Sequence, residues 1–270
     1  MKARWLQILV FGSCLFIVLD ITLRVTGNTS LIPIIVILGS FIVPVAMTAY
    51  FYGHIRDRDI SPPLLTTTFL VGGALGVTAA AFLEFNTLKT LNLGALVAVG
   101  FIEESAKLIF PLAMYALSRY RHEADGLLFG VAAGMGFAAL ETITYGMNAL
   151  TQSHGNIGSL EQVLLLRGLL SPAGHAAWTG IVCSVIWRER AKSGHATFNL
   201  AVIGFFLLAV FLHFSWDFVN MANIPILLAG AGMCVLAVVS LGLLIARYRE
   251  ARRDLPKPVV LPEISSQSLD

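Results

Sequence analysis

The sequence is short of charged residues. Asp, Glu, Lys and Arg make up only 13% of its 270 residues, and 57% are hydrophobic, whereas soluble domains carry roughly 25% charged residues. This shortage excludes an ordinary soluble globular protein. The formal net charge of +2 is small, so we expect no nucleic-acid partner, and the expected surroundings are a lipid bilayer.

Cysteine and the short motifs of common soluble enzymes are also scarce. Cys14, Cys183 and Cys234 stand singly in apolar runs without a CxxC pair, which is typical of small packing residues. The chain has no Gly-rich phosphate loop, no HExxH motif and no internal repeat. Its 24 glycines are dense in three apolar runs (GGALG, GVAAGMG and AGAGM), where they are expected to let helices approach closely.

Long apolar runs account for most of the chain. Runs of about 18 or more residues predict membrane-spanning helices, and eight are present, at about residues 5–25, 30–53, 64–84, 91–117, 125–150, 162–187, 196–220 and 224–246. The first is expected to be a retained helix, because no small-x-small cleavage site follows it. The predicted fold is therefore an all-α, polytopic membrane helix bundle of about eight transmembrane helices. It forms one domain over residues 1–250, with a flexible cytoplasmic tail over 251–270.

Basic residues are distributed unevenly between the two sides of these runs. Lys and Arg favour the cytoplasmic side of a membrane, and fourteen of the eighteen lie inside if the N-terminus is inside. Only Arg24 and Lys89 then lie outside, while Lys107 and Arg167 fall within runs. We therefore expect both termini to be cytoplasmic, in a multi-pass protein of the cell membrane (the cytoplasmic membrane in a bacterium).

A small set of ionisable residues lies within the predicted spans. A charge at the bilayer centre costs about 2.5–3.5 kcal/mol on insertion scales, so such residues are expected to be paired and functional. The set is Glu103, Glu104, Lys107, Glu141, Arg167, His175, His213 and Asp217. Counting along each run places the glutamates, histidines and aspartate between the middle of the bilayer and its outer side. This placement predicts a shared polar cavity that is reached from outside.

The fourth run carries three of these charges in the sequence GFIEESAKLIFP. Glu103 and Glu104 precede Lys107 by four and three residues, so the lysine can reach either carboxylate from one helix face. Pro111 follows one turn later and cannot donate to the carbonyl of Lys107. We expect the helix to bend beside the charges.

Helical spacing also groups the other polar residues. Phe137, Glu141 and Tyr145 recur every four residues on one face of the fifth run, and His213 and Asp217 share one face of the seventh. In the sixth run, Pro172 is expected to loosen the helix three residues before the histidine at position 175.

Several of these residues also have a structural interpretation. Arg167 lies near the outer end of its span and is expected to pair with Glu161 or Glu141. Tyr145 is typical of an aromatic residue at the membrane interface. Glu84 lies close enough to the outer end of the third run that we expect it to be solvated.

Glutamates and histidines without an obvious Ser or Cys nucleophile indicate activation of water. A buried carboxylate can act as a general base, and histidine can share that role or polarise a carbonyl. Alternatively, Glu141, His175 and His213 are a plausible ligand set for a divalent metal such as zinc, which activates bound water. The spacing leaves the metal-free and metal-dependent mechanisms equally open, and both lead to hydrolysis.

Three motifs resemble those of a known protease family. EESAK (Glu103, Glu104, Lys107), FAALE (Phe137, Glu141) and HFSWD (His213, Asp217) resemble the EExxK, FxxxE and HxxxD motifs of PrsW-type intramembrane proteases. That family lies within the CAAX-processing and bacteriocin-processing group of membrane proteases. The lone His175 between the second and last motifs also fits, and the resemblance spans about residues 91–220.

The resemblance implies a membrane-embedded peptidase that cleaves a single-pass or lipid-anchored membrane protein, such as the first cut in an anti-sigma factor. Glu103 and Glu104 are its paired glutamates, and both are expected to be catalytic. It implies that Glu103 activates water with Glu141 or His175. His213 and Asp217 would support the oxyanion, with Lys107, Phe137 and Tyr145 in supporting roles.

Two other classes of function remain open from the sequence. A proton- or ion-coupled transporter also places acidic residues and histidines at the bilayer midplane, but it commonly shows inverted repeats and paired broken helices, which this sequence lacks. A catalytically silent scaffold or immunity-type protein of the same fold would tolerate loss of Glu103 or His175.

Overall fold

A computed structural model describes residues 4–55, 60–87, 93–221 and 224–253. Every regular element in these ranges is helical, which confirms the predicted all-α fold. The helices are α1 (Arg4–Thr26), α2 (Ile32–His54), α3 (Pro62–Thr67), α4 (Gly73–Thr87), α5 (Leu93–Lys107), α6 (Ile109–Ala116), α7 (Glu123–Gln152), α8 (Ile157–Leu170), α9 (His175–Ser193), α10 (Leu200–Met221) and α11 (Ile226–Arg253). Three short turns stand between them, η1 (Thr29–Leu31), η2 (Thr68–Gly72) and η3 (Ser171–Ala173). The last three helical residues of α11 reach into the segment predicted as a tail, and the rest of that segment lies outside the described residues.

Seven helical segments of the described chain are long and apolar enough to cross a membrane. They are α1, η1–α2, α3–η2–α4, α7, α8–η3–α9, α10 and α11. The eighth predicted span corresponds to α5 and α6, which are 15 and 8 residues long. Neither helix alone spans the hydrocarbon core, which needs about 20 residues. The prediction of about eight spans therefore holds, with the charged span built from two pieces.

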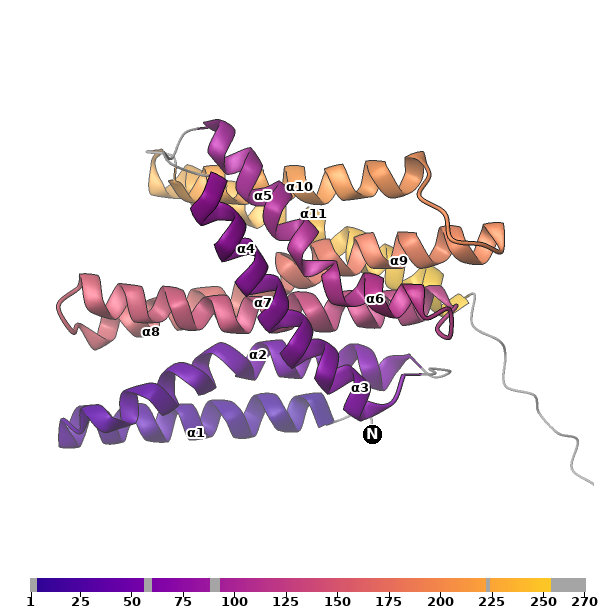
Figure 1. The fold of residues 1–270 in the computed structure, drawn as a ribbon. Helices are drawn as coiled ribbons and strands as arrows, with labels where there is room; N and C mark the ends of the chain where they lie inside the picture. Colours follow the sequence, from indigo (N-terminus) through magenta and orange to yellow (C-terminus); the bar gives the residue numbers. More distant parts are fainter. Residues whose placement is uncertain (1–3, 56–59, 88–92, 222–223, 254–270) are drawn as a thin grey trace, which may run out of the picture.

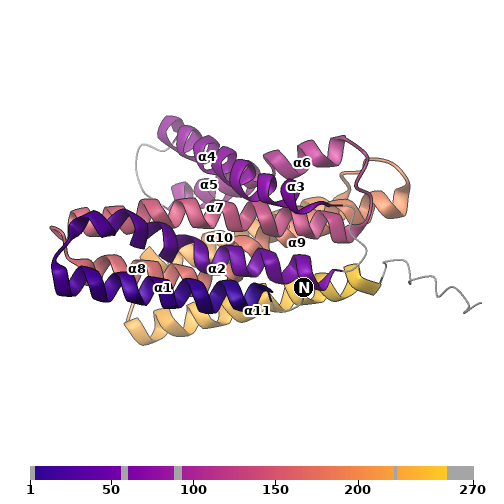
Figure 2. The same cartoon turned by 90° about the horizontal axis from the view of Figure 1, so that it is seen from below.

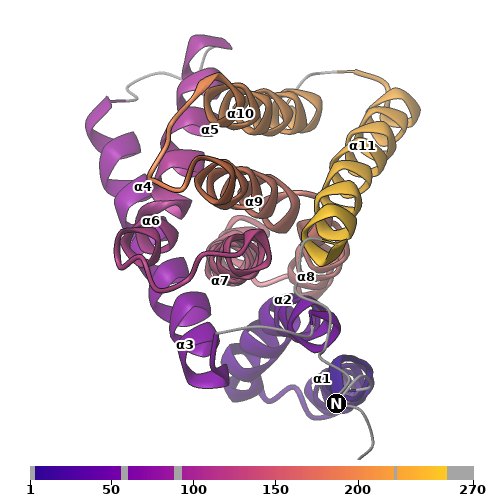
Figure 3. The same cartoon turned by 90° about the vertical axis from the view of Figure 1, so that its right-hand side faces the viewer.

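Helix α7 forms the centre of the bundle. Of its most apolar stretch, 83% is buried inside the protein, compared with 6% for each of α1 and α11. Seen along the bundle, α7 is surrounded by α2, α4, α6, α8 and α9, and α1 and α11 lie on the periphery (Figure 3). A side chain on α7 can therefore meet groups from several helices, whereas those of α1 and α11 largely face lipid.

Small residues let α9 approach α7 closely. Gly126, Gly130 and Gly134 recur every four residues on the α7 face that meets α9. A Cβ atom at Gly130 would lie 2.5 Å from the carbonyl oxygen of Thr179, and one at Gly134 would lie 2.3 Å from that of His175. Both distances are shorter than a Cβ contact allows, so glycine is required here and the predicted packing role is confirmed.

The glycines of α11 do not have this role. A Cβ atom at Gly230 would meet nothing within 4 Å, and one at Gly232 would only touch Val219 at 3.4 Å. The prediction of close packing through the glycines of the last span is wrong. The reason is the peripheral position of α11 (Figure 2), where only 6% of the most apolar stretch is buried inside the protein.

Two helix breaks occur beside prolines. Helix α5 ends at Lys107 and α6 begins at Ile109, since Pro111 has no N–H to bond to the carbonyl of Lys107. Pro172 lies in η3, between α8 and α9, and α9 begins at His175. Both predicted distortions are confirmed, and each leaves site residues beside a helix end.

The beginning of α1 and the end of α11 lie at the same end of the bundle, and the α7–α8 connection lies at the opposite end (Figure 1). This arrangement agrees with an even number of crossings. The α7–α8 end is the one that the placement of basic residues predicts to be outside.

Candidate active site

Lys107 joins the two adjacent glutamates of α5. Its Nζ donates to Oε2 of Glu103 at 3.1 Å and to Oε1 of Glu104 at 2.8 Å. The lysine side chain is fully buried, and its ammonium lies 4.3 Å from the centre of the Phe137 ring. The spacing predicted that Lys107 could reach either carboxylate, and in the structure it binds both.

His213 on α10 completes this group of charges. Its Nδ1 lies 2.8 Å from Oε1 of Glu104, while Nε2 lies 3.6 Å from Oε2 of Glu103 and 3.5 Å from Oδ2 of Asp217. Since an ionised Glu104 only accepts hydrogen bonds, Nδ1 carries the proton in this pair. In the neutral ring Nε2 then keeps its lone pair and faces Glu103 and Asp217.

Glu141 on α7 is the second centre of charge. Its Oε2 lies 3.1 Å from Nε2 of His175 and 2.5 Å from a terminal nitrogen of Arg167. The guanidinium also donates to the Thr142 hydroxyl at 3.2 Å and lies 4.2 Å from the centre of the Tyr145 ring. The expected pairing of Arg167 is therefore confirmed with Glu141. The alternative partner, at position 161, pairs instead with Arg24.

Aromatic rings hold the two histidines in place. Phe137 lies 5.4 Å from His175, and Trp178 stacks on His213 with ring centres 4.8 Å apart. The indole Nε1 of Trp178 donates to Oγ of Ser240 on α11 at 3.0 Å. The sequence interpretation missed Trp178 and Ser240. The only signal was the spacing of the tryptophan, three residues after His175 and therefore on the same face of the helix.

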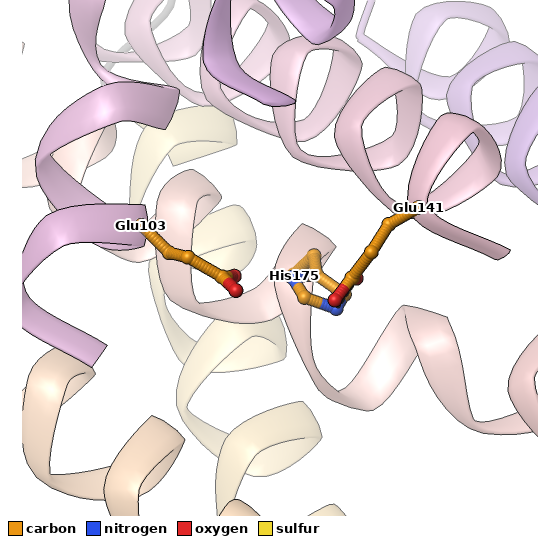
Figure 4. A group of neighbouring side chains, drawn as sticks. All are labelled: Glu103, Glu141 and His175. Carbon is orange, nitrogen blue, oxygen red and sulfur yellow. Dashed lines mark ion pairs between the residues drawn. The ribbon is translucent and has the colours of Figure 1, made fainter. Parts of the chain in front are cut away.

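The two charge centres meet at Glu103, Glu141 and His175. Each offers one ligand atom, and these three atoms all lie within 4.8 Å of one another. Figure 4 shows Glu103 reaching from α5 toward the paired Glu141 and His175. The structure thus brings together all six ionisable residues that the sequence proposed for chemistry. Phe137 and Lys107 lie inside this cluster, and the half-exposed Tyr145 lies at its edge.

The donor set suits a divalent metal such as zinc. Carboxylate and imidazole groups are both zinc ligands, and three protein ligands leave a fourth position for water or substrate, as in catalytic zinc sites. Nδ1 of His175 is buried and has no hydrogen-bond partner among the described residues, so this nitrogen is also available. The geometric trio differs from the ligand set predicted from sequence, because it contains Glu103 where the prediction had His213.

Exposure increases across the site toward the α7–α8 end. The Lys107 side chain is 0% exposed and that of Glu104 1%, whereas those of Arg167 and Asp217 are 25% and 26% exposed. The more exposed members of the site therefore lie on the side of Arg167 and Asp217. The sequence predicted this side to face outward.

Glu84 on α4 departs from its expected environment. The sequence suggested a solvated carboxylate, but Oε1 of Glu84 is buried and has no hydrogen-bond partner among the described residues. The expectation of a solvated group is wrong for this oxygen, although the side chain as a whole is only partly buried, because α4 crosses α7 and packs against α5 and α7 with one face (Figure 1).

Comparison with known proteins gives a consistent match. Residues 61–245 match the model of the family described as PrsW family intramembrane metalloprotease. The protein named Protease PrsW of Shouchella clausii (strain KSM-K16) is 27% identical over 186 residues, which cover 64% of this chain and 79% of the relative. Protease PrsW of Bacillus subtilis (strain 168) is 26% identical over 193 residues, which cover 68% and 82%. No solved structure matches the chain with significance.

Proposed function

The chain belongs to the PrsW family of intramembrane metalloproteases, and from this premise we propose that it hydrolyses a peptide bond of a single-pass or lipid-anchored membrane protein. Membership makes the chain a membrane-embedded peptidase and a multi-pass protein of the cell membrane. The substrate class, the reacting residues and the role of a metal are the parts that we propose.

The observation that carries this proposal is the meeting of Glu103 with Glu141 and His175. The three side chains come from three helices, and their ligand atoms lie within 4.8 Å of one another. Charged groups rarely enter membrane spans without a function. In the proposed reaction, Glu103 takes a proton from the attacking water as the general base, and Glu141 orients His175 through the 3.1 Å contact.

Glu104 has a different role from its neighbour. Its side chain is 1% exposed, and its Oε1 accepts hydrogen bonds from both Lys107 and His213, so it is less accessible to a substrate than Glu103. We assign to Glu104 the positioning of these two residues. The Lys107 ammonium lies between both glutamates and offsets their negative charge.

His213 is assigned to the oxyanion that forms when water attacks the peptide carbonyl, and Asp217, whose carboxylate faces Nε2 at 3.5 Å, is assigned to holding the His213 ring. When its ring is protonated, His213 donates from Nδ1 to Glu104, and Nε2 points toward Glu103 and Asp217. A fixed donor at this place would stabilise negative charge that develops on the carbonyl oxygen.

Glu103, Glu141 and His175 are also the residues that would hold a metal. A bound divalent metal such as zinc would supply an activated water and would polarise the scissile carbonyl. The same three side chains serve both mechanisms, so the metal-free alternative needs no different arrangement. Metal analysis of the purified protein, with cleavage measured in the presence and absence of a chelator, separates them.

Regulated proteolysis is the biological role that the family resemblance implies, such as the first cut in an anti-sigma factor. The test compares cells that make the wild-type protein with cells that make Glu103→Gln, using N-terminal proteomics of the membrane fraction. New N-termini within or beside transmembrane segments should be present only with the wild type. Identical sets of N-termini at equal protein levels would contradict the proposed peptidase activity.

A further inference from the structure

Glu84 lies on the face of α4 that packs against the site. A Cβ atom at Gly76 would lie 3.0 Å from the Phe137 ring and 3.6 Å from Cα of Lys107. One turn further along α4, Ala80 is buried in a cluster with Phe137 and Ala106. Because residues four apart share a helix face, Glu84 is the next side chain on this stripe.

The neighbouring helices place carboxylates at the same level. Moving one turn from Phe137 toward the α7–α8 end leads to Glu141, and moving one turn from Lys107 in the same direction leads to Glu103. The step from Ala80 to Glu84 has this direction too, since α4 and α7 run toward that end and α5 runs away from it (Figure 1). Glu84 therefore forms a layer with the two glutamates of the site. In agreement, it lies within electrostatic range of Glu141.

Glu84 differs from the other carboxylates of the site because its buried oxygen has no partner among the residues that the structure describes. Glu103 and Glu104 bind Lys107, Glu141 binds Arg167, and Asp217 faces a histidine. Among the described residues Glu84 makes no ion pair or hydrogen bond through its buried Oε1. It also stands outside the trio whose atoms could share a metal.

The site as a whole contains more acids than bases. Five carboxyl groups belong to it, on Glu84, Glu103, Glu104, Glu141 and Asp217, against the two permanent cations Lys107 and Arg167. A buried carboxylate oxygen without a partner, such as Oε1 of the partly buried Glu84, is unfavourable until a cation or a strong hydrogen-bond donor reaches it. The free protein therefore holds an acceptor that a positively charged ligand would satisfy.

We propose that Glu84 is a specificity-determining residue that binds a lysine or arginine side chain of the substrate, beside the peptide bond that is cut. This inference rests on the proposed function, because the ligand is taken to be a membrane-protein segment. It goes further by naming a chemical requirement of the substrate, a basic residue within about one turn of the cleavage position at the α7–α8 side.

A binding experiment tests the requirement without relying on cleavage. The probes are fluorescent transmembrane peptides of leucine and alanine that carry one Lys, Gln or Glu, placed at four successive positions near the predicted outer end. Binding to the protein in nanodiscs is measured for the wild type, Glu84→Gln and Glu84→Lys. Glu161→Gln is the matched control, since Glu161 is a partly buried carboxylate that already pairs with Arg24.

The wild type and the control should bind the best Lys peptide about tenfold more tightly than its Gln counterpart, as expected for a charge-assisted hydrogen bond. Glu84→Gln should remove this preference, and Glu84→Lys should transfer it to the Glu peptide. A wild type without a Lys preference would overturn the proposal. A preference that persists in Glu84→Gln would overturn it as well.

The thermal stability of Glu84→Gln distinguishes substrate binding from a structural role. A neutral amide replaces an unpartnered carboxylate, so the variant should unfold at the wild-type temperature or above it. A clear loss of stability would show a structural partner and contradict the assignment. If the protein prefers the Lys peptide but the proteomic experiment detects no cleaved membrane protein, the proposed role of Glu84 in binding is supported and the proposed peptidase function is contradicted.

Discussion

Nδ1 of His213 on α10 lies 2.8 Å from Oε1 of Glu104 on α5, and the same oxygen accepts a hydrogen bond from Lys107. One buried carboxylate thus links a helix that carries the general base to a helix that carries the oxyanion donor. The positions of the site residues depend on this link. The stability of the protein depends on the balance of buried positive and negative charge in the site.

Replacing Lys107, the buried cation of the site, tests the contribution of this charge balance to stability. Lys107→Met leaves Glu103 and Glu104 without their buried cation, and breaking a buried pair in this way costs about 3–5 kcal/mol. We expect a large drop in the unfolding temperature of the purified protein. Adding Glu104→Gln to Lys107→Met should recover part of the loss, because it removes one uncompensated charge. Equal unfolding temperatures for wild type and Lys107→Met would contradict the ion-pair assignment.

The second prediction concerns the close contact between α7 and α9 at Gly134. Gly134→Ala places a Cβ atom where the His175 carbonyl stands, at 2.3 Å, so the start of α9 must shift. A displacement of about 1 Å can lower a rate about 100-fold, and we expect cleavage to fall by that order. Gly242→Ala is the control, since a Cβ atom there meets nothing within 4 Å. Similar activity in both variants would show that the α7–α9 contact does not position His175.

The third prediction concerns the hydrogen bond that Trp178 donates to Ser240. Ser240→Ala removes the acceptor of a buried indole N–H, which costs about 1–3 kcal/mol and frees the ring that stacks on His213. We expect kcat to fall with little change in KM, because Trp178 acts through the histidine. Ser240→Thr keeps the hydroxyl and should restore kcat. Failure of the threonine variant to restore it would leave a packing role only.

The fourth prediction concerns the side of the membrane from which the site is reached. Asn220 is exposed on α10, seven residues beyond His213 toward the predicted outer side. In a variant with Cys14→Ser and Cys234→Ser, Asn220→Cys should react with an impermeant thiol reagent added outside intact cells. Reaction only after the cytoplasmic side is exposed would reverse the predicted orientation.

The helices could largely be predicted from sequence because apolar length is a strong signal in a membrane protein. Their bounds were harder to predict. The α8–α9 segment begins at Ile157 and ends at Ser193. It extends beyond the apolar run at both ends, because polar residues at a membrane surface can continue a helix past the point where its apolar sequence ends. The break at Leu108 followed from Pro111, a local rule that needs no tertiary information.

The site could be predicted only in part. Charges within apolar runs identified Glu103 and Glu141 directly, since such residues are rare there. Trp178 is itself apolar, so only its spacing from His175 distinguished it in an apolar helix. The direction of Glu84 depends on how α4 is rotated against α5 and α7, which the close contacts of glycines in α4 and α7 determine. That rotation depends on how the helices pack, so it could not be predicted from the sequence of α4 alone.

The most direct test of the account is the cleavage rate of Glu103→Gln against wild type in liposomes, with a substrate taken from the proteomic comparison. Removing a general base lowers rates about 100- to 10,000-fold. The account predicts at least a 100-fold loss, with an unchanged unfolding temperature and full activity in the control Glu161→Gln. A Glu103→Gln rate equal to that of the wild type would contradict the central claim that this carboxylate activates water.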